Sequence, residues 1–235
     1  MTAAEIIAEL KLLAKDSYKK TLLRHGIPEP VLGVSIEELK KIQKRVKKDY
    51  QLALDLFETG IYDAMYLAGL IADDARMTKK DLQRWVEKAN SNSLCAYTVP
   101  WVAAESSHGW EMALKWIDSK MDGIVGAGWA TLVSLMAIKD DEELDLPKLK
   151  ELLKRVEKTI QNAPNDVRYA MNMFVIGLGT YVKPLGDLAM KSAEKIGMVT
   201  VDVGDTACKV PYAPEYINKV RKRGTVGKKR KSAKC

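Results

Sequence analysis

The sequence is poor in residues that hold disulfides or metal ions. It contains three cysteines and two histidines in 235 residues. Cys95, Cys208 and Cys235 are far apart and form no CxxC pair, so they fit a reducing compartment better than a disulfide framework. His25 and His108 have no cysteine or second histidine at metal-ligand spacing, which argues against a structural zinc. We therefore expect a cytoplasmic protein that binds no metal and no other cofactor.

Long apolar runs and a targeting segment are also missing. No stretch approaches the ~20 apolar residues that a membrane-spanning helix needs. Residues 1–16 alternate charged with apolar side chains and lack a small-residue cleavage site, unlike a signal peptide. We therefore expect no membrane partner. Hydrophobic residues make up 47% of the chain, which is enough for a continuous core and excludes global disorder.

Apolar side chains recur at helical spacing along most of the sequence. After Ser35, which has Glu38 three residues on as in a capping box, the stripe is Leu39, Ile42 and Val46. Similar stripes are separated by breaks rich in glycine, proline and asparagine, and they predict about eleven helices of 10–18 residues. Residues 198–203 are β-rich but short and isolated. Residues 167–178 are apolar nearly all round, which predicts a fully buried helix. Short turns between helices suit either a bundle or an α-solenoid.

Positive charge is concentrated at the end of the chain. The formal net charge is +7, and residues 216–235 contain nine basic and no acidic residues: Lys219, Arg221, Lys222, Arg223, Lys228, Lys229, Arg230, Lys231 and Lys234. We therefore divide the chain into a helical domain, residues 1–215, and a basic C-terminal helix and tail, residues 216–235. Such a concentration favours a polyanionic partner, and the alternative is a solvated terminus that aids solubility.

A second basic cluster lies on the helix predicted after Ser35. Lys40, Lys44, Lys47 and Lys48 form a stripe on one exposed face of that helix. Such a row can contact duplex phosphates, although a solvated helix face explains it equally well. Together, the two clusters favour nucleic acid as the partner.

Only a few residues are candidates for chemistry. On a helix predicted over residues 92–105, Tyr97, Trp101 and Glu105 are four residues apart on one face. Two aromatic rings beside a carboxylate can hold a cationic or unstacked base. The commoner alternative is that Trp101 packs in the core and Glu105 is solvated. The glycine-rich stretch 123–128 does not match GxGxxG and follows no strand, so a dinucleotide site is not expected.

The sequence resembles the HEAT-like-repeat (AlkD-like) DNA alkylation repair proteins over about residues 30–235. The resemblance rests on Leu-Gly-Val-Ser at 32–35, Tyr-Asp-Ala at 62–64, Val-Pro at 99–100, Lys-Trp-Ile at 115–117, Thr-Ala-Cys-Lys-Val-Pro at 206–211 and Gly-Lys-Lys-Arg-Lys at 227–231. It implies an all-α fold, an α-α superhelix of HEAT-like antiparallel helix pairs (an ARM/HEAT-type solenoid). It also implies that a basic concave face holds double-stranded DNA.

The same resemblance places the family's excision residues on unlike side chains. The aspartate that stabilises the separating cation corresponds to Ala96, and an aromatic position corresponds to Asn92. The arginine falls near Gly128 and a second tryptophan near Met173. An alanine offers no negative charge to an oxocarbenium-like transition state. We therefore predict a duplex-binding member of the family without the usual glycosylase activity.

Two other functions remain open. One is an active N-alkylpurine DNA glycosylase whose site is rebuilt from Tyr97, Trp101, Glu105 or Trp129. The other is a protein-binding helical scaffold whose basic tail aids solubility or targeting. If the basic row and the tail meet on one surface, nucleic-acid binding is favoured over the scaffold. A carboxylate between aromatic rings on that surface would favour the glycosylase.

Overall fold

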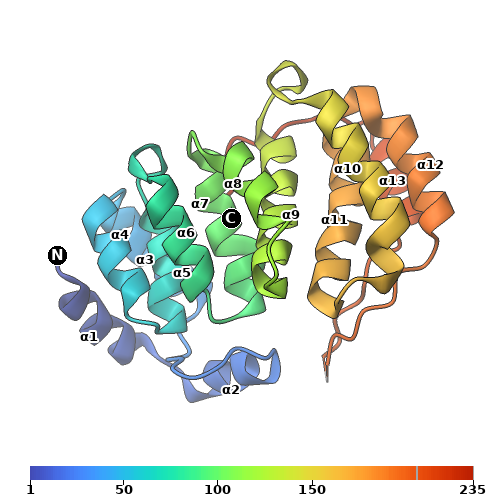
Figure 1. Cartoon of the computed structure of the whole chain (residues 1–235). Coiled ribbons are helices and arrows are strands. Elements are labelled where there is room, and N and C mark those ends of the chain that lie inside the picture. The colour runs from blue at the N-terminus through green and yellow to red at the C-terminus, as the bar shows by residue number, and fades with distance from the viewer. Residues whose placement is uncertain (205, 235) are drawn as a thin grey trace.

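The computed structural model describes residues 1–204 and 206–234, and every regular element among them is helical (Figure 1). Its thirteen α-helices are α1 (Ala3–Leu13), α2 (Asp16–Arg24), α3 (Ile36–Val46), α4 (Tyr50–Glu58), α5 (Tyr62–Ile71), α6 (Lys79–Lys88), α7 (Val99–Glu105), α8 (Gly109–Trp116), α9 (Asp122–Ile138), α10 (Leu146–Thr159), α11 (Asn165–Tyr181), α12 (Gly186–Ile196) and α13 (Ala213–Lys222). Five short elements join them: η1 (Asp74–Arg76), the π-helical η2 (Leu94–Thr98), η3 (Asp141–Glu143), η4 (Ile160–Asn162) and η5 (Lys183–Leu185).

The helices form a solenoid of stacked pairs. Helix α4 packs on α5, α6 on α7, α8 on α9, and α12 on both α11 and α13. The odd-numbered helices α3, α5, α7, α9, α11 and α13 also contact one another in that order, and we call them the inner row. Figure 1 shows the pairs side by side from α3 and α4 to α12 and α13. The predicted all-α, HEAT-like superhelix is confirmed.

Local sequence signals account for most helix boundaries. Ser35 caps α3 by accepting a hydrogen bond from the Glu38 N–H, and Thr78 forms a complete capping box with Asp81 at the start of α6. The predicted count of about eleven helices is too low, because the short helix α2 buries none of its side chains and so shows no clear apolar stripe. Residues 198–203 form no strand. None of the described helices is long and apolar enough to cross a membrane.

Two apolar clusters make up the core. The first is built mainly from α1 to α8 and the second mainly from α9 to α13, and opposite faces of α9 contribute to both. Phe174 on α11 is fully buried, edge-on to Trp129 at 5.0 Å between ring centroids. The prediction of a fully buried helix over 167–178 is right for most positions. It fails at Arg168, Tyr169, Ala170 and Met173, which are half-buried.

A buried carboxylate fixes the first helices to the solenoid. Asp63 in the first turn of α5 is 0% exposed and accepts hydrogen bonds from the N–H groups of Leu32, Gly33 and Val34, at 2.6, 3.2 and 2.7 Å. Gly33 has a φ of +91°, and a Cβ there would lie 2.7 Å from Lys19. Only glycine fits here, and the turn that it allows holds α2 near the N-terminal end of α5.

Candidate nucleic-acid interface

The helix predicted over residues 92–105 is present and contains an irregularity. Residues 94–98 form a π-turn, in which the Val99 N–H donates to the Leu94 carbonyl, and α7 continues from it. Trp101 is buried, with its ring centroid 5.8 Å from those of Tyr66 and Tyr97. Tyr97 is 46% exposed and is the part of this aromatic cluster that faces solvent. The tryptophan therefore supports the tyrosine from below.

A hollow lies beside Tyr97, on the N-terminal half of α9. Gly126 is buried, yet a Cβ built on it would meet no atom within 4 Å, and one on Gly123 would meet only the Cys95 sulfur at 3.5 Å. Further along α9, Val133 packs against Gly177 of α11, so the same face of α9 looks toward α11. Burial raises the pKa of Tyr169 on α11, and the nearby Tyr97 adds to the rise. The hollow thus has a glycine floor and a tyrosine toward each side.

One carboxylate lies close to this hollow. Asp166, in the first turn of α11, is exposed and is near enough to act electrostatically on Cys95. Burial raises the pKa of the Cys95 thiol to about 11, and Asp166 adds to the rise, so this cysteine stays protonated at neutral pH. Asp166 therefore lies near the π-turn that carries Cys95 and Tyr97, whereas the predicted acid Glu105 is at the other end of α7.

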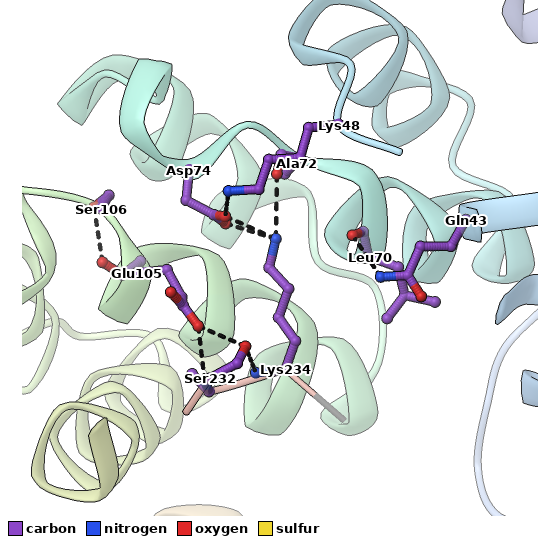
Figure 2. Close-up of polar contacts among 11 residues, drawn as sticks. Gln43, Lys48, Leu70, Ala72, Asp74, Glu105, Ser106, Ser232 and Lys234 are labelled. Carbon is purple, nitrogen blue, oxygen red and sulfur yellow. Dashed lines mark hydrogen bonds and ion pairs between the residues drawn. The ribbon is translucent and has the colours of Figure 1, made fainter. Parts of the chain in front are cut away.

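Glu105 lies at the opposite end of α7, where the C-terminal tail covers it. Its Oε1 accepts hydrogen bonds from the Ser232 hydroxyl at 2.7 Å and from the Ala233 N–H at 2.8 Å (Figure 2). Along the helix axis, about 12 Å separates residue 105 from residue 97. Tyr97, Trp101 and Glu105 therefore do not form a single site. The carboxylate holds the tail, and the exposed aromatic ring faces the hollow.

The two basic clusters meet at the C-terminal ends of the inner row. The Asp74 carboxylate, 3% exposed, binds Lys234 Nζ at 2.8 Å and Lys48 Nζ at 3.3 Å (Figure 2). Burial lowers the pKa of Lys234, and Asp74 opposes that effect. Lys48 and Lys47 are not on the helix, because α3 ends at Val46 and Lys47 turns to a φ of +64°. Lys44, Lys47 and Lys48 are nonetheless all exposed, and Lys40 is half-buried.

The four basic side chains at residues 228–231 of the tail point in two directions. Lys229 points inward, its Nζ 2.8 Å from the Asp141 carboxylate and its side chain 15% exposed. Lys228, Arg230 and Lys231 are exposed and remain available to a ligand. Cys235, at the end of this tail, lies outside the described residues. Among residues 1–204 and 206–234, no cluster of His, Cys, Asp or Glu is arranged to hold a metal ion.

Sequence reasoning did not single out several of these residues. Asp63, Asp74 and Asp141 bind partners between 26 and 160 residues away, and no local pattern marks them. Helix α2 was also missed as a cationic element, although Lys15, Lys20 and Arg24 are exposed on and beside it. For Gly126 a signal existed, because three glycines between 123 and 128 predict a close approach or an open space.

A family model described as "DNA alkylation repair enzyme" matches residues 6–217. The chain belongs to the DNA alkylation repair family. Two relatives match the chain over nearly its full length. They are "Uncharacterized protein Lin0241" of Listeria innocua and "Uncharacterized protein Lmo0209" of Listeria monocytogenes. Each is 32% identical over 228 residues, which cover 95% of this chain and 99% of the relative.

A solved structure is similar over the whole length. It is described as "A new family of proteins related to the HEAT-like repeat DNA glycosylases with affinity for branched DNA structures". It is 34% identical, the match covers 100% of both chains, and the TM-score is 0.92. The resemblance to HEAT-like DNA alkylation repair proteins is thereby confirmed. The similarity covers the C-terminal tail of this member of the family as well as its helices.

Proposed function

We propose that this DNA alkylation repair family protein binds branched or otherwise distorted DNA and accommodates an unstacked base in the hollow above Gly126. The observation that carries the proposal is the open space over Gly126 beside the half-exposed Tyr97. Bases at a junction or a distortion are partly unstacked, and an aromatic ring offers them a replacement surface. The similar structure described as having affinity for branched DNA supports this choice of ligand.

Phosphate contacts come from cations at the ends of the inner row. Lys44 lies in the last turn of α3 and Lys47 and Lys48 just after it, and Lys48 lies near the tail because it shares Asp74 with Lys234. Lys228, Arg230 and Lys231 extend this basic rim, and Lys40 lies at its edge. Along α7, about 12 Å separates Tyr97 from Glu105, which the tail covers, and this is less than the width of a duplex. One duplex can therefore touch the basic rim with its backbone and present a base to the hollow.

Filling the hollow tests the proposal. Gly126→Leu places a side chain in the open space without a clash, and Gly126→Ala adds a single methyl group as a graded control. Tyr97→Ala removes the aromatic surface, and Tyr216→Ala on α13 removes a tyrosine of nearly equal exposure, 44% against 46%. Binding to a four-way junction, a three-way junction and a linear duplex is measured by fluorescence anisotropy at fixed salt.

Branched DNA should bind Gly126→Leu and Tyr97→Ala about 5- to 150-fold more weakly, since stacking on one aromatic side chain contributes ~1–3 kcal/mol per base. Gly126→Ala and Tyr216→Ala should bind like the parent. Linear duplex should be less affected. With about six phosphates neutralised, log K against log salt should have a slope of roughly −5. Unchanged junction binding by Gly126→Leu would refute the proposed place of the base.

Base excision is the second candidate function, and Asp166 is the observation that favours it. This carboxylate acts electrostatically on Cys95, in the π-turn that also carries Tyr97. We still expect methylated duplex to release no 3-methyladenine or 7-methylguanine, since Ala96 stands at the family's aspartate position. Losing one preorganised electrostatic group typically costs ~10²–10³ in rate. Multiple turnovers that Asp166→Asn abolishes, but Glu105→Gln does not, would establish a rebuilt glycosylase site.

A further inference from the structure

The C-terminal segment, residues 227–234, runs back over the solenoid instead of leaving it. The segment starts at the end of α11, where the Gly227 N–H donates to the Thr180 carbonyl at 2.8 Å. It passes the end of α9, where the Arg230 N–H donates to the Ala137 carbonyl at 2.7 Å. It then reaches Glu105 at the end of α7 and Asp74 after α5. Figure 1 shows the C-terminus beside α7, in the middle of the molecule.

Every contact falls on the C-terminal end of an inner-row helix. The last carbonyls of a helix lack intrahelical donors and carry the negative end of the helix dipole. Lys229 Nζ donates to the carbonyls of Met136 on α9 and Tyr181 on α11, at 3.0 and 2.8 Å. Lys234 Nζ donates to the carbonyl of Ala72, the C-cap of α5, at 3.2 Å. The two lysines therefore satisfy orphan carbonyls and pair with Asp141 and Asp74 at the same time.

The segment also joins the two apolar clusters. Ala233 is 1% exposed and belongs to the cluster built mainly from α1 to α8, whereas Gly227 and Lys229 donate hydrogen bonds to Thr180 and Tyr181 on α11, a helix of the other cluster. In a solenoid each pair normally contacts its neighbours only, so bending between distant pairs is opposed weakly. Contacts between residue 234 and residues 72 and 74 span 162 and 160 positions. These contacts restrain the relative positions of distant helix pairs, which packing between neighbouring pairs does not do.

We propose that residues 227–234 form an internal strap that fixes the spacing of α5, α7, α9 and α11 and couples the two halves of the solenoid. Resting on the proposed function, the strap also sets the separation between the basic rim and the hollow, and hence the preference for branched over linear DNA. Its two inward lysines hold the strap. Its outward cations Lys228, Arg230 and Lys231 are carried on it at fixed positions.

Full-length variants separate the position of the strap from its charge. Ala233→Tyr cannot fit a site that is 1% exposed, so it displaces the strap while leaving all its cations in the chain. Lys234→Met removes an inward cation and leaves Asp74 with Lys48 alone. Lys231→Met is the matched control, because it removes the same charge from the exposed side. A Lys229→Met variant, matched by Lys228→Met, repeats the comparison at the other anchor.

Amide hydrogen exchange and urea unfolding are measured first, without DNA. In Ala233→Tyr and Lys234→Met, the amides of Arg230 and Ala233 should exchange at least about tenfold faster, because their hydrogen bonds open locally. Unfolding should begin at lower urea and should separate into two steps. Lys231→Met should match the parent in both measurements. Equal behaviour of Lys234→Met and Lys231→Met, together with unchanged exchange in Ala233→Tyr, would overturn the strap.

DNA binding is measured second, on the same variants. Displacing the strap should reduce the ratio of junction to linear-duplex affinity by about fivefold or more, a change of ~1 kcal/mol. Lys231→Met should weaken both ligands alike, because phosphate contacts carry no shape information. If the parent shows no preference for branched DNA, the proposed function is refuted. The exchange and unfolding results still test whether residues 227–234 act as a strap. An unchanged ratio in Ala233→Tyr, with exchange increased, would refute the link between strap and preference.

Discussion

Replacing Asp63 tests how strongly one buried carboxylate organises the first third of the chain. Its Oδ1 accepts from the amides of Gly33 and Val34, and its Oδ2 accepts from the amide of Leu32. Residues 32–34 belong to no helix or strand, so their N–H groups have no partners in a regular element. Asp63→Ala removes both acceptor oxygens, and with them all three hydrogen bonds, and leaves the buried donors of Gly33 and Val34 without partners. Asp63→Asn keeps one oxygen but points an NH₂ group at an amide donor.

The expected magnitude follows from those donors. A buried donor left unsatisfied costs ~1–3 kcal/mol, and the two in Asp63→Ala together cost about 4 kcal/mol. Asp63→Asn keeps the Gly33 and Val34 bonds without the charge and should cost about 2 kcal/mol. Domains of this kind are stable by ~5–15 kcal/mol, so the alanine variant loses a large share of the total. Most of that loss arises where residues 14–34 meet α5.

Urea unfolding followed by circular dichroism gives the free energies, and hydrogen exchange locates the loss. Amides of residues 32–34 should lose protection in both variants, whereas those of α11 and α12 should not. Asp55→Asn is the matched control, because Asp55 is exposed on α4 and contacts only Gln51. A loss below about 1 kcal/mol in Asp63→Ala would mean that solvent reaches segment 32–34, and would refute the reasoning.

Two further predictions concern the C-terminal half. Phe174→Asp places an unpaired charge at a fully buried position against Trp129 and should abolish folding, with a loss above ~4 kcal/mol; Phe174→Leu should stay folded, and circular dichroism distinguishes them. The hydrogen bonds from Lys195 and Ser192 lower the pKa of Glu157, which joins α10 to α12. Its contribution is therefore fully present above the ordinary carboxyl pKa and is lost as pH falls through the lower folded value. Thermal melts from pH 3 to pH 7 should show Glu157→Gln less stable at neutral pH only; a constant difference would contradict this.

The helices could be predicted from sequence because their signals are local. Ser35 and Thr78 caps, and apolar stripes such as Leu82, Trp85 and Val86, depend on residues within one or two turns. The boundary at Val46 could not be predicted, since the positive φ of Lys47 follows from the return of the chain to α4. Pattern alone also left bundle and solenoid equally open, and the family resemblance decided between them.

The candidate site was predicted less well, for a physical reason. Tyr97 and Glu105 were both identified, but the sequence did not show that the tail covers the Glu105 end of α7. The basic residues 228–231 read as one run, yet Lys229 points toward the protein while the other three side chains are exposed. Lys234 turns inward to Asp74 and Lys229 turns inward to Asp141. These carboxylates precede their lysines by 160 and 88 residues. A charge pattern states how many cations are present and leaves their partners open.

The π-turn at residues 94–98 has a consequence for matching this helix to its relatives. Such a turn adds one residue to a helical circuit, so the side chain above Tyr97 on the preceding circuit is five residues earlier, at Asn92, and not four. Upstream of Val99, sequence spacing and angular position are therefore offset by one residue. A regular helix aligned on Val99 and Pro100 assigns the direction of the family's aspartate to Ala96. Deleting one residue between 94 and 98 would restore ordinary winding and turn residues 92 and 93 by about 100° about the helix axis.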